Sequence, residues 1–200
     1  MDPIIIILPI VLVAFIIAIG VPLTLTLKKL FWRPQEKIPG FETRQARVNG
    51  LFKPEEVAEV FHIFEECWNK KIEKRNLKPV FDKINIFWKN EPIDLGQEYT
   101  VNGKTFSKAT GLTRTKKDVD VWVYNTKRIQ ENGQNKIVPK DREEIKISST
   151  ALAHELIHIV LWQVEGDPDA DHEGSLYTGW TKEHTDVEIE TNKRLKEKGL

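Results

Sequence analysis

Two histidines four positions apart, His154 and His158, enclose the segment HELIH. Residues four apart lie on one face of an α-helix, so both imidazoles can bind a single metal ion. Glu155 follows the first histidine and can accept a proton from a zinc-bound water, because zinc lowers the pKa of that water toward neutrality. The segment predicts a zinc-dependent hydrolase, with His154 and His158 as ligands and Glu155 as general base.

The residues around the motif are apolar, as expected for a buried helix. Leu152, Leu156 and the pair Ile159-Val160 would bury most of the helix around the three polar side chains. Unpaired polar groups are costly to bury, and a bound metal ion would compensate them. The alternatives are a hydrogen-bonded network, an exposed polar stripe, or a purely structural zinc site.

The chain just after the motif predicts the end of the helix and a third ligand. Gly166-Asp167-Pro168 can terminate the helix, and His172 follows 14 residues after His158. Finishing the helix takes about six residues and about 9 Å, and the remaining eight can extend up to about 26 Å, so His172 can return to the metal. His172 is the predicted third ligand, with Asp169, Asp171 or a later Glu as alternatives.

The HELIH helix followed by GDPDADHEG resembles a zincin-like zinc metallopeptidase domain over residues 144–180. Leu161 and Val164 stand where a metzincin would carry Gly and His, which disfavours that subfamily. A gluzincin-like site would use a glutamate from a later helix, and an aspzincin-like site would use Asp169 or Asp171. The later glutamates available are Glu183, Glu188 and Glu190.

The same resemblance implies a peptide or protein substrate bound in an extended form along an edge strand beside the motif helix. Residues 144–147 and 119–124 are the candidates for this strand. The candidates for stabilising the oxyanion of a tetrahedral intermediate are Tyr177 and His184.

The periodicity of the remaining chain predicts an α+β domain over residues 51–200. A helix opens at Pro54, and its apolar stripe is Val57, Val60, Phe61, Phe64 and Trp68. Alternating residues predict strands near Val80–Trp88 and 119–124, and residues 144–147 are expected to form a last short strand. Asn-Gly pairs at 102–103 and 132–133 predict two hairpins. The expected fold is a zincin-like domain with a small, mostly antiparallel sheet and a terminal helix over 181–198, anchored by Val187, Ile189 and Leu195.

The N-terminal segment predicts one transmembrane helix before the domain. The 24 uncharged residues from Ile4 to Leu27 span about 36 Å as a helix, enough to cross a hydrocarbon core of about 30 Å. A cleaved signal peptide is the alternative, but it lacks a basic first region and a small-residue cleavage site. The expected organisation is an anchor over 1–30, which contacts the bilayer through residues 4–27, and a linker over 31–50.

The charge distribution predicts the side of the membrane and excludes one class of partner. Lys28, Lys29, Arg33 and Lys37 follow the segment and no basic residue precedes it, so the domain is expected on the cytoplasmic side or inside a virion. Lys plus Arg and Asp plus Glu both total 30, so no nucleic-acid partner is expected. Cys67 is the only cysteine, so any metal ligands must be histidines and carboxylates.

Two other functions compete with peptide hydrolysis. One is a membrane-tethered structural or assembly protein, such as a virion component, that retains a zincin-like fold. The other is a zinc amidase that acts on a substrate other than protein. Retention of Glu155 argues against the structural role, because a structural metal site needs no base.

Overall fold

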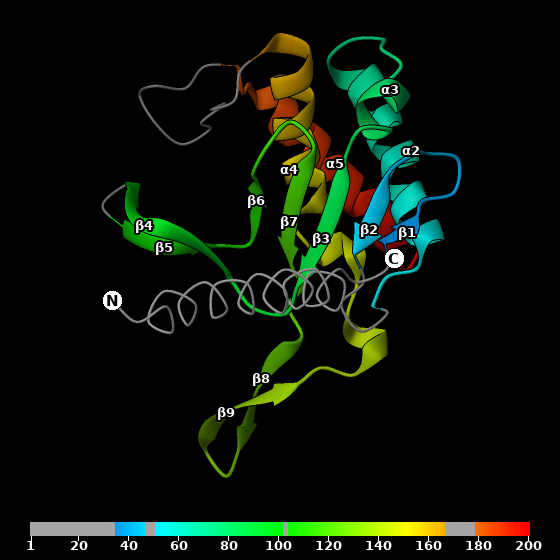
Figure 1. Ribbon diagram of the computed structural model, residues 1–200. Coiled ribbons are helices and arrows are strands. Elements are labelled where there is room, and N and C mark those ends of the chain that lie inside the picture. Colours follow the sequence, from blue (N-terminus) through cyan, green and yellow to red (C-terminus); the bar gives the residue numbers. More distant parts are fainter. Residues whose placement is uncertain (1–34, 47–50, 102–103, 167–178) are drawn as a thin grey trace, which may run out of the picture. The chain divides into compact units, whose positions relative to one another are not determined.

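The computed structural model of the chain (Figure 1) describes residues 35–46, 51–101, 104–166 and 179–200. These residues all belong to one structural unit, Gln35–Leu200. The predicted anchor over residues 1–30, with its bilayer segment 4–27, lies outside the described residues. Within the described part of the chain, none of the helices is both long and apolar enough to cross a membrane.

A five-stranded sheet with the order β1-β2-β3-β7-β6 forms the centre of this unit. Its strands are β1 (Gln35–Lys37), β2 (Arg44–Ala46), β3 (Asn85–Lys89), β6 (Gly111–Thr113) and β7 (Asp118–Trp122). The three inner strands β2, β3 and β7 run parallel, whereas β1 and β6 pair antiparallel to their neighbours. The sheet is therefore mixed, and β6 is one of its two edge strands.

The fold class predicted from the sequence is wrong in the type of sheet. The fold is α+β, but its five-stranded sheet is mixed rather than mostly antiparallel. Alternation along a strand shows which side chains are buried but carries no information on strand direction. Direction depends on the connections, and the long helical crossover between β2 and β3 makes those two strands parallel.

Four α-helices accompany the sheet in the described residues: α2 (Pro54–Lys71), α3 (Lys78–Phe81), α4 (Leu152–Val160) and α5 (Lys182–Glu197). The predicted apolar stripe of α2 is confirmed, because all five of its side chains are buried. They share one core with Ile86 and Trp88 of β3, Val119 and Val121 of β7, and the buried residues of α4. The core thus holds α4 against the same face of the sheet as α2.

Residues 35–46, which the sequence analysis placed in a linker, form two strands of the main sheet. Ile38 and Phe41 of this segment are buried in the core. The buried amide of Gln45 accepts a hydrogen bond of 2.9 Å from Nε1 of Trp88 and donates one of 3.1 Å to the carbonyl of Phe52. The mixed charge of this segment concealed these few inward-facing residues.

Both predicted hairpins are present. One joins β4 (Ile93–Val101) to β5 (Lys104–Ala109), and the other joins β8 (Thr126–Glu131) to β9 (Gln134–Pro139). In the second turn, Asn132 and Gly133 have φ values of 52° and 75°, as a two-residue turn of this kind requires.

Two local predictions are wrong. Residues 142–149 form two short 3₁₀ turns, Arg142–Glu144 and Ile147–Ser149, instead of a strand. The first turn is closed by the Asp141 N–H, which donates to the Glu144 carboxylate at 2.8 Å. Ile189 is 60% exposed, because it lies two positions after Val187 and so on the far side of α5 from the core.

Candidate functional site

The motif helix α4 presents its two histidines on a single face. Within residues 152–160, His154 and His158 are partly exposed, whereas the other seven side chains are buried. The two imidazole rings lie side by side, with centroids 5.1 Å apart. The four-residue spacing therefore gives the arrangement that the sequence predicted for these two side chains.

Glu155 is buried between α4 and the edge strand β6. Its Oε2 accepts a hydrogen bond of 2.8 Å from Oγ1 of Thr113. Gly111 lies on the same side of β6, and a Cβ atom at this position would lie only 2.3 Å from Oε1 of Glu155. Because glycine has no Cβ, position 111 leaves space for the Glu155 carboxylate.

Burial raises the pKa of the Glu155 carboxyl group to about 7. The imidazole of His154 and the hydrogen bond from Thr113 both act in the opposite direction, but they do not cancel the cost of placing a charged carboxylate in the protein interior. A carboxyl group with a pKa near neutrality can accept and release a proton under physiological conditions, as a general base must.

Glu188 of α5 bonds to the first histidine of the motif. Its Oε2 lies 3.0 Å from Nδ1 of His154. When Nδ1 carries the proton, His154 donates to this carboxylate and its Nε2 keeps the lone pair needed to bind a metal. Glu188 therefore orients the ring of His154 across the packing of α4 against α5.

Trp180 forms an apolar wall against both histidines. Its ring centroid lies 4.9 Å from that of His154 and 5.0 Å from that of His158. The indole is 3% exposed, and its Nε1 donates a hydrogen bond of 2.9 Å to Oγ1 of Thr185 in the first turn of α5. This hydrogen bond and the burial hold the indole in one orientation.

The chain that follows α4 continues as a π-helical turn, Leu161–Glu165, and ends at Gly166 with a φ of 77°. The predicted role of Gly166 in ending the helix is thus confirmed. The predicted third ligand His172 and its alternatives Asp169 and Asp171 lie outside the described residues. Within the described residues, His, Cys, Asp and Glu side chains form no group of three or more that could hold a metal ion.

The donor set at α4 nevertheless fits a zinc ion in two respects. Two imidazoles lie next to each other on the exposed side of the helix, and the Nδ1 contact with Glu188 leaves Nε2 of His154 as the ligand atom. His154 and His158 are the residues that would hold the ion. His172 remains the predicted third ligand.

The edge strand beside the motif helix is β6, which the sequence analysis did not single out. Residues 119–124, one of the two predicted candidates, include most of β7, which is paired on both sides with β3 and β6. The other candidate, residues 144–147, is not a strand. β6 packs on α4, and Thr113 links the two elements.

One of the two oxyanion candidates, Tyr177, lies outside the described residues. His184 is buried at the start of α5, where its Nδ1 accepts a hydrogen bond of 2.8 Å from the Thr181 N–H. Burial lowers the pKa of His184. Its place in the helix cap therefore gives it a structural role.

Sequence reasoning missed three residues of the site: Gly111, Thr113 and Trp180. Gly111 and Thr113 belong to a strand of only three residues, too short to show an alternating pattern. Trp180 directly precedes the terminal helix, and its size and position could have suggested a packing role there. Comparison of the chain with protein-family models, with curated proteins and with solved structures gave no match.

Proposed function

We propose that this protein is a zinc-dependent hydrolase that cleaves peptide bonds, with His154 and His158 as metal ligands and Glu155 as general base. The observation that carries the proposal is the position of Glu155. A buried carboxylate with a pKa of about 7 stands next to two adjacent imidazoles on one helix. A structural metal site would need the histidines but not this carboxylate.

The two oxygens of Glu155 have different surroundings. Oε2 accepts the hydrogen bond from Thr113. Oε1 lies beside Gly111, and the carboxylate also accepts a hydrogen bond from the main chain of Thr113. The carboxylate of Glu155 would take the proton of the attacking water and pass it to the leaving amine. Zinc, when bound, supplies the Lewis acid that polarises the scissile carbonyl.

The edge strand supports a peptide as the substrate. The outer edge of β6 is not paired with another strand in the described part of the chain. An extended peptide can add to such an edge through its main-chain hydrogen-bonding groups. Because Thr113 of β6 contacts Glu155, a peptide bound there would place one of its carbonyl groups close to the base.

Metal analysis and peptide cleavage by the purified full chain test this proposal. We expect about one zinc per chain and cleavage of a random peptide library. His154→Ala and His158→Ala should lose both metal and activity, whereas Glu155→Gln should keep the metal and lose most turnover. His62→Ala is the matched control, because His62 is exposed on α2, away from the motif.

Unchanged cleavage by Glu155→Gln would exclude the proposed base. Zinc binding without cleavage of any peptide would instead favour a structural role, or an amidase with a substrate other than protein. Cleavage of a non-protein amide by the same preparation would separate these two outcomes.

A further inference from the structure

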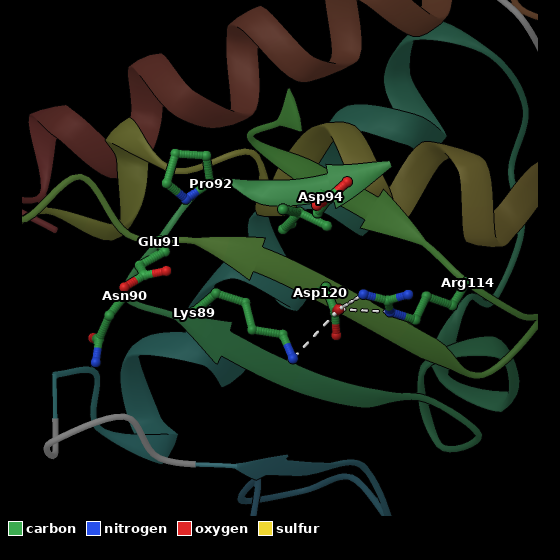
Figure 2. A pocket seen from close by; sticks show the side chains of 8 residues that line it. Lys89, Asn90, Glu91, Pro92, Asp94, Arg114 and Asp120 are labelled. Atoms are coloured by element: carbon green, nitrogen blue, oxygen red, sulfur yellow. Dashed lines mark hydrogen bonds and ion pairs between the residues drawn. The ribbon is translucent and has the colours of Figure 1, made fainter. Parts of the chain in front are cut away.

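The face of the sheet opposite α4 carries a cavity of about 420 Å³. It is formed by the end of β3 and the segment after it, by Asp120 of β7, and by Arg114, which directly follows β6 (Figure 2). The side chains that line it are Lys89, Asn90, Glu91, Pro92, Ile93, Asp94, Arg114 and Asp120. Charged groups therefore dominate its lining.

Asp120 organises the charges of this cavity. It is 2% exposed. Its Oδ2 accepts a hydrogen bond of 2.6 Å from Nε of Arg114 and also lies 2.6 Å from Nη2 of the same guanidinium. The Nζ of Lys89 lies 3.4 Å from the same oxygen, and Figure 2 shows both cationic side chains turned toward it. Two cations therefore contact this one carboxylate, and the lining also holds the carboxylates of Glu91 and Asp94.

The strand register places this cluster beside the edge that carries the base. Leu112 of β6 pairs with Asp120 of β7, so the two side chains lie on the same face of the sheet. Thr113 faces the other way, toward Glu155. Arg114 follows directly, and its bond to Asp120 shows that it lies on the cavity side. The guanidinium is held in place, yet the side chain is 49% exposed.

We propose that Arg114 binds an acidic side chain of the substrate and so makes the enzyme prefer substrates that carry one. This inference rests on the proposed peptidase function and on binding of the peptide along β6. Alternate side chains of an extended peptide point to opposite faces of the sheet. A residue next to the scissile bond that points away from α4 faces Arg114, whose Nη1 can bind a carboxylate while Asp120 fixes the guanidinium. Lys89, whose Nζ lies 3.4 Å from Asp120, adds a second positive charge to the cavity.

Two other acids, Glu91 and Asp94, also line the cavity. Within the described residues, the ion pairs of Lys89 and Arg114 are both with Asp120. Asp94 uses Oδ1 to accept a hydrogen bond of 2.8 Å from the Gly96 N–H, and Glu91 is exposed. Neither of these carboxylates forms an ion pair with Arg114 in the described part of the chain, so its guanidinium is held by Asp120 alone.

Cleavage of matched peptide pairs by the full zinc-loaded chain tests the inference. Each pair differs only by Glu or Gln at one position around the scissile bond. We expect at least a tenfold higher kcat/KM for the Glu peptide at one position, or at two positions separated by one residue. The difference should lie mainly in KM, because Arg114 would contact the substrate equally in the bound complex and in the transition state.

Variants assign the preference to Arg114. Arg114→Gln should reduce the Glu:Gln ratio to about one, whereas Arg128→Gln, on the exposed strand β8, should leave it unchanged. Because Arg114→Gln leaves the buried Asp120 with Lys89 as its one ion-pair partner among the described residues, the double variant Arg114→Gln/Asp120→Asn is measured as well. It removes both members of the ion pair and should lose the preference in the same way.

The outcomes separate this inference from the function on which it rests. Glu155-dependent cleavage with no preference for Glu, or with a preference for Lys or Arg, would overturn the acidic subsite and leave the peptidase intact. A preference for Glu that survives in both Arg114 variants would also overturn it. Failure to cleave any peptide would remove both proposals.

Discussion

Oγ1 of Thr113 donates a hydrogen bond of 2.8 Å to Oε2 of Glu155, and this bond joins the edge strand β6 to the motif helix α4. The same hydroxyl lies 3.3 Å from the main-chain carbonyl of Glu155. The strand proposed to bind the substrate is thus tied to the proposed base. Changes in β6 should therefore alter the proton chemistry of Glu155 as well as substrate binding.

Removal of the Thr113 hydroxyl should move the pH dependence of hydrolysis. The hydrogen bond from Thr113 lowers the pKa of Glu155, so Thr113→Val should raise that pKa. The base acts when deprotonated, so the acidic limb of the kcat/KM profile should shift to higher pH. Thr113→Ser should return the limb to its original position. An unshifted limb in Thr113→Val would mean that another group controls it.

The metal-free chain should lose stability as Glu155 ionises. Its folded pKa of about 7 lies above the usual glutamate value of 4.5, so the folded state binds this proton more tightly than the unfolded state. The contribution is fully present below about pH 4.5 and is lost as the pH rises through about 7. In EDTA, Glu155→Gln should gain free energy of unfolding relative to wild type between pH 4 and pH 8, by up to about 3 kcal/mol. Urea unfolding measures this difference, and a pH-independent difference would contradict the assignment.

A methyl group at Gly111 should displace the base. The added Cβ would lie 2.3 Å from Oε1 and 2.7 Å from Cδ of Glu155, so one of the two elements must move. Gly111→Ala should cost about 1–3 kcal/mol of stability and reduce turnover while zinc stays bound. The same change in a Glu155→Ala background should cost much less, because the clashing atoms are gone. Equal costs in the two backgrounds would argue against the contact.

Loss of the Glu188 carboxylate should weaken zinc binding. Glu188→Gln removes the charged partner of His154 Nδ1, and a loss of about 10- to 100-fold in zinc affinity is expected for a partner of this kind. Competition with a chelating dye measures the affinity. Glu190→Gln, two positions along the same helix, is the control and should bind zinc as wild type does.

The predicted third ligand is tested in the same assay. His172→Ala should lose more zinc affinity than Glu188→Gln, because a ligand is removed rather than the partner of a ligand. Asp169→Ala and Asp171→Ala are measured beside it. If His172→Ala binds zinc normally while one carboxylate variant fails, the third ligand is that carboxylate.

Trp180 should position both histidines through its indole ring. Trp180→Ala should lose about 3–5 kcal/mol of stability and also lower zinc affinity, whereas Trp180→Phe keeps part of the wall and should lose less. Trp88→Phe is a close control, because Trp88 is also 3% exposed and also donates from Nε1 at 2.9 Å, but to Gln45 in the sheet. A Co²⁺ absorption spectrum should change in the Trp180 variants and not in Trp88→Phe.

The sequence alone was sufficient for features that depend on near neighbours in the chain. Four-residue spacing places His154 beside His158 whatever packs around the helix, because helical geometry determines it. The apolar stripe of α2 and the two Asn-Gly hairpins were predicted for the same reason. In each case the interacting residues are close in sequence and the backbone has few conformations that satisfy the pattern.

Tertiary structure decided the contacts that join distant segments. Thr113 and Glu155 are 42 positions apart, and His154 and Glu188 are 34 apart, so no local pattern could pair them. The direction of β2, β3 and β7 also depended on how the connections pack, as did the burial of residues 35–46. Local periodicity specifies which face of an element is apolar. Which elements meet, and which polar groups then share a buried site, is determined only when those faces pack together.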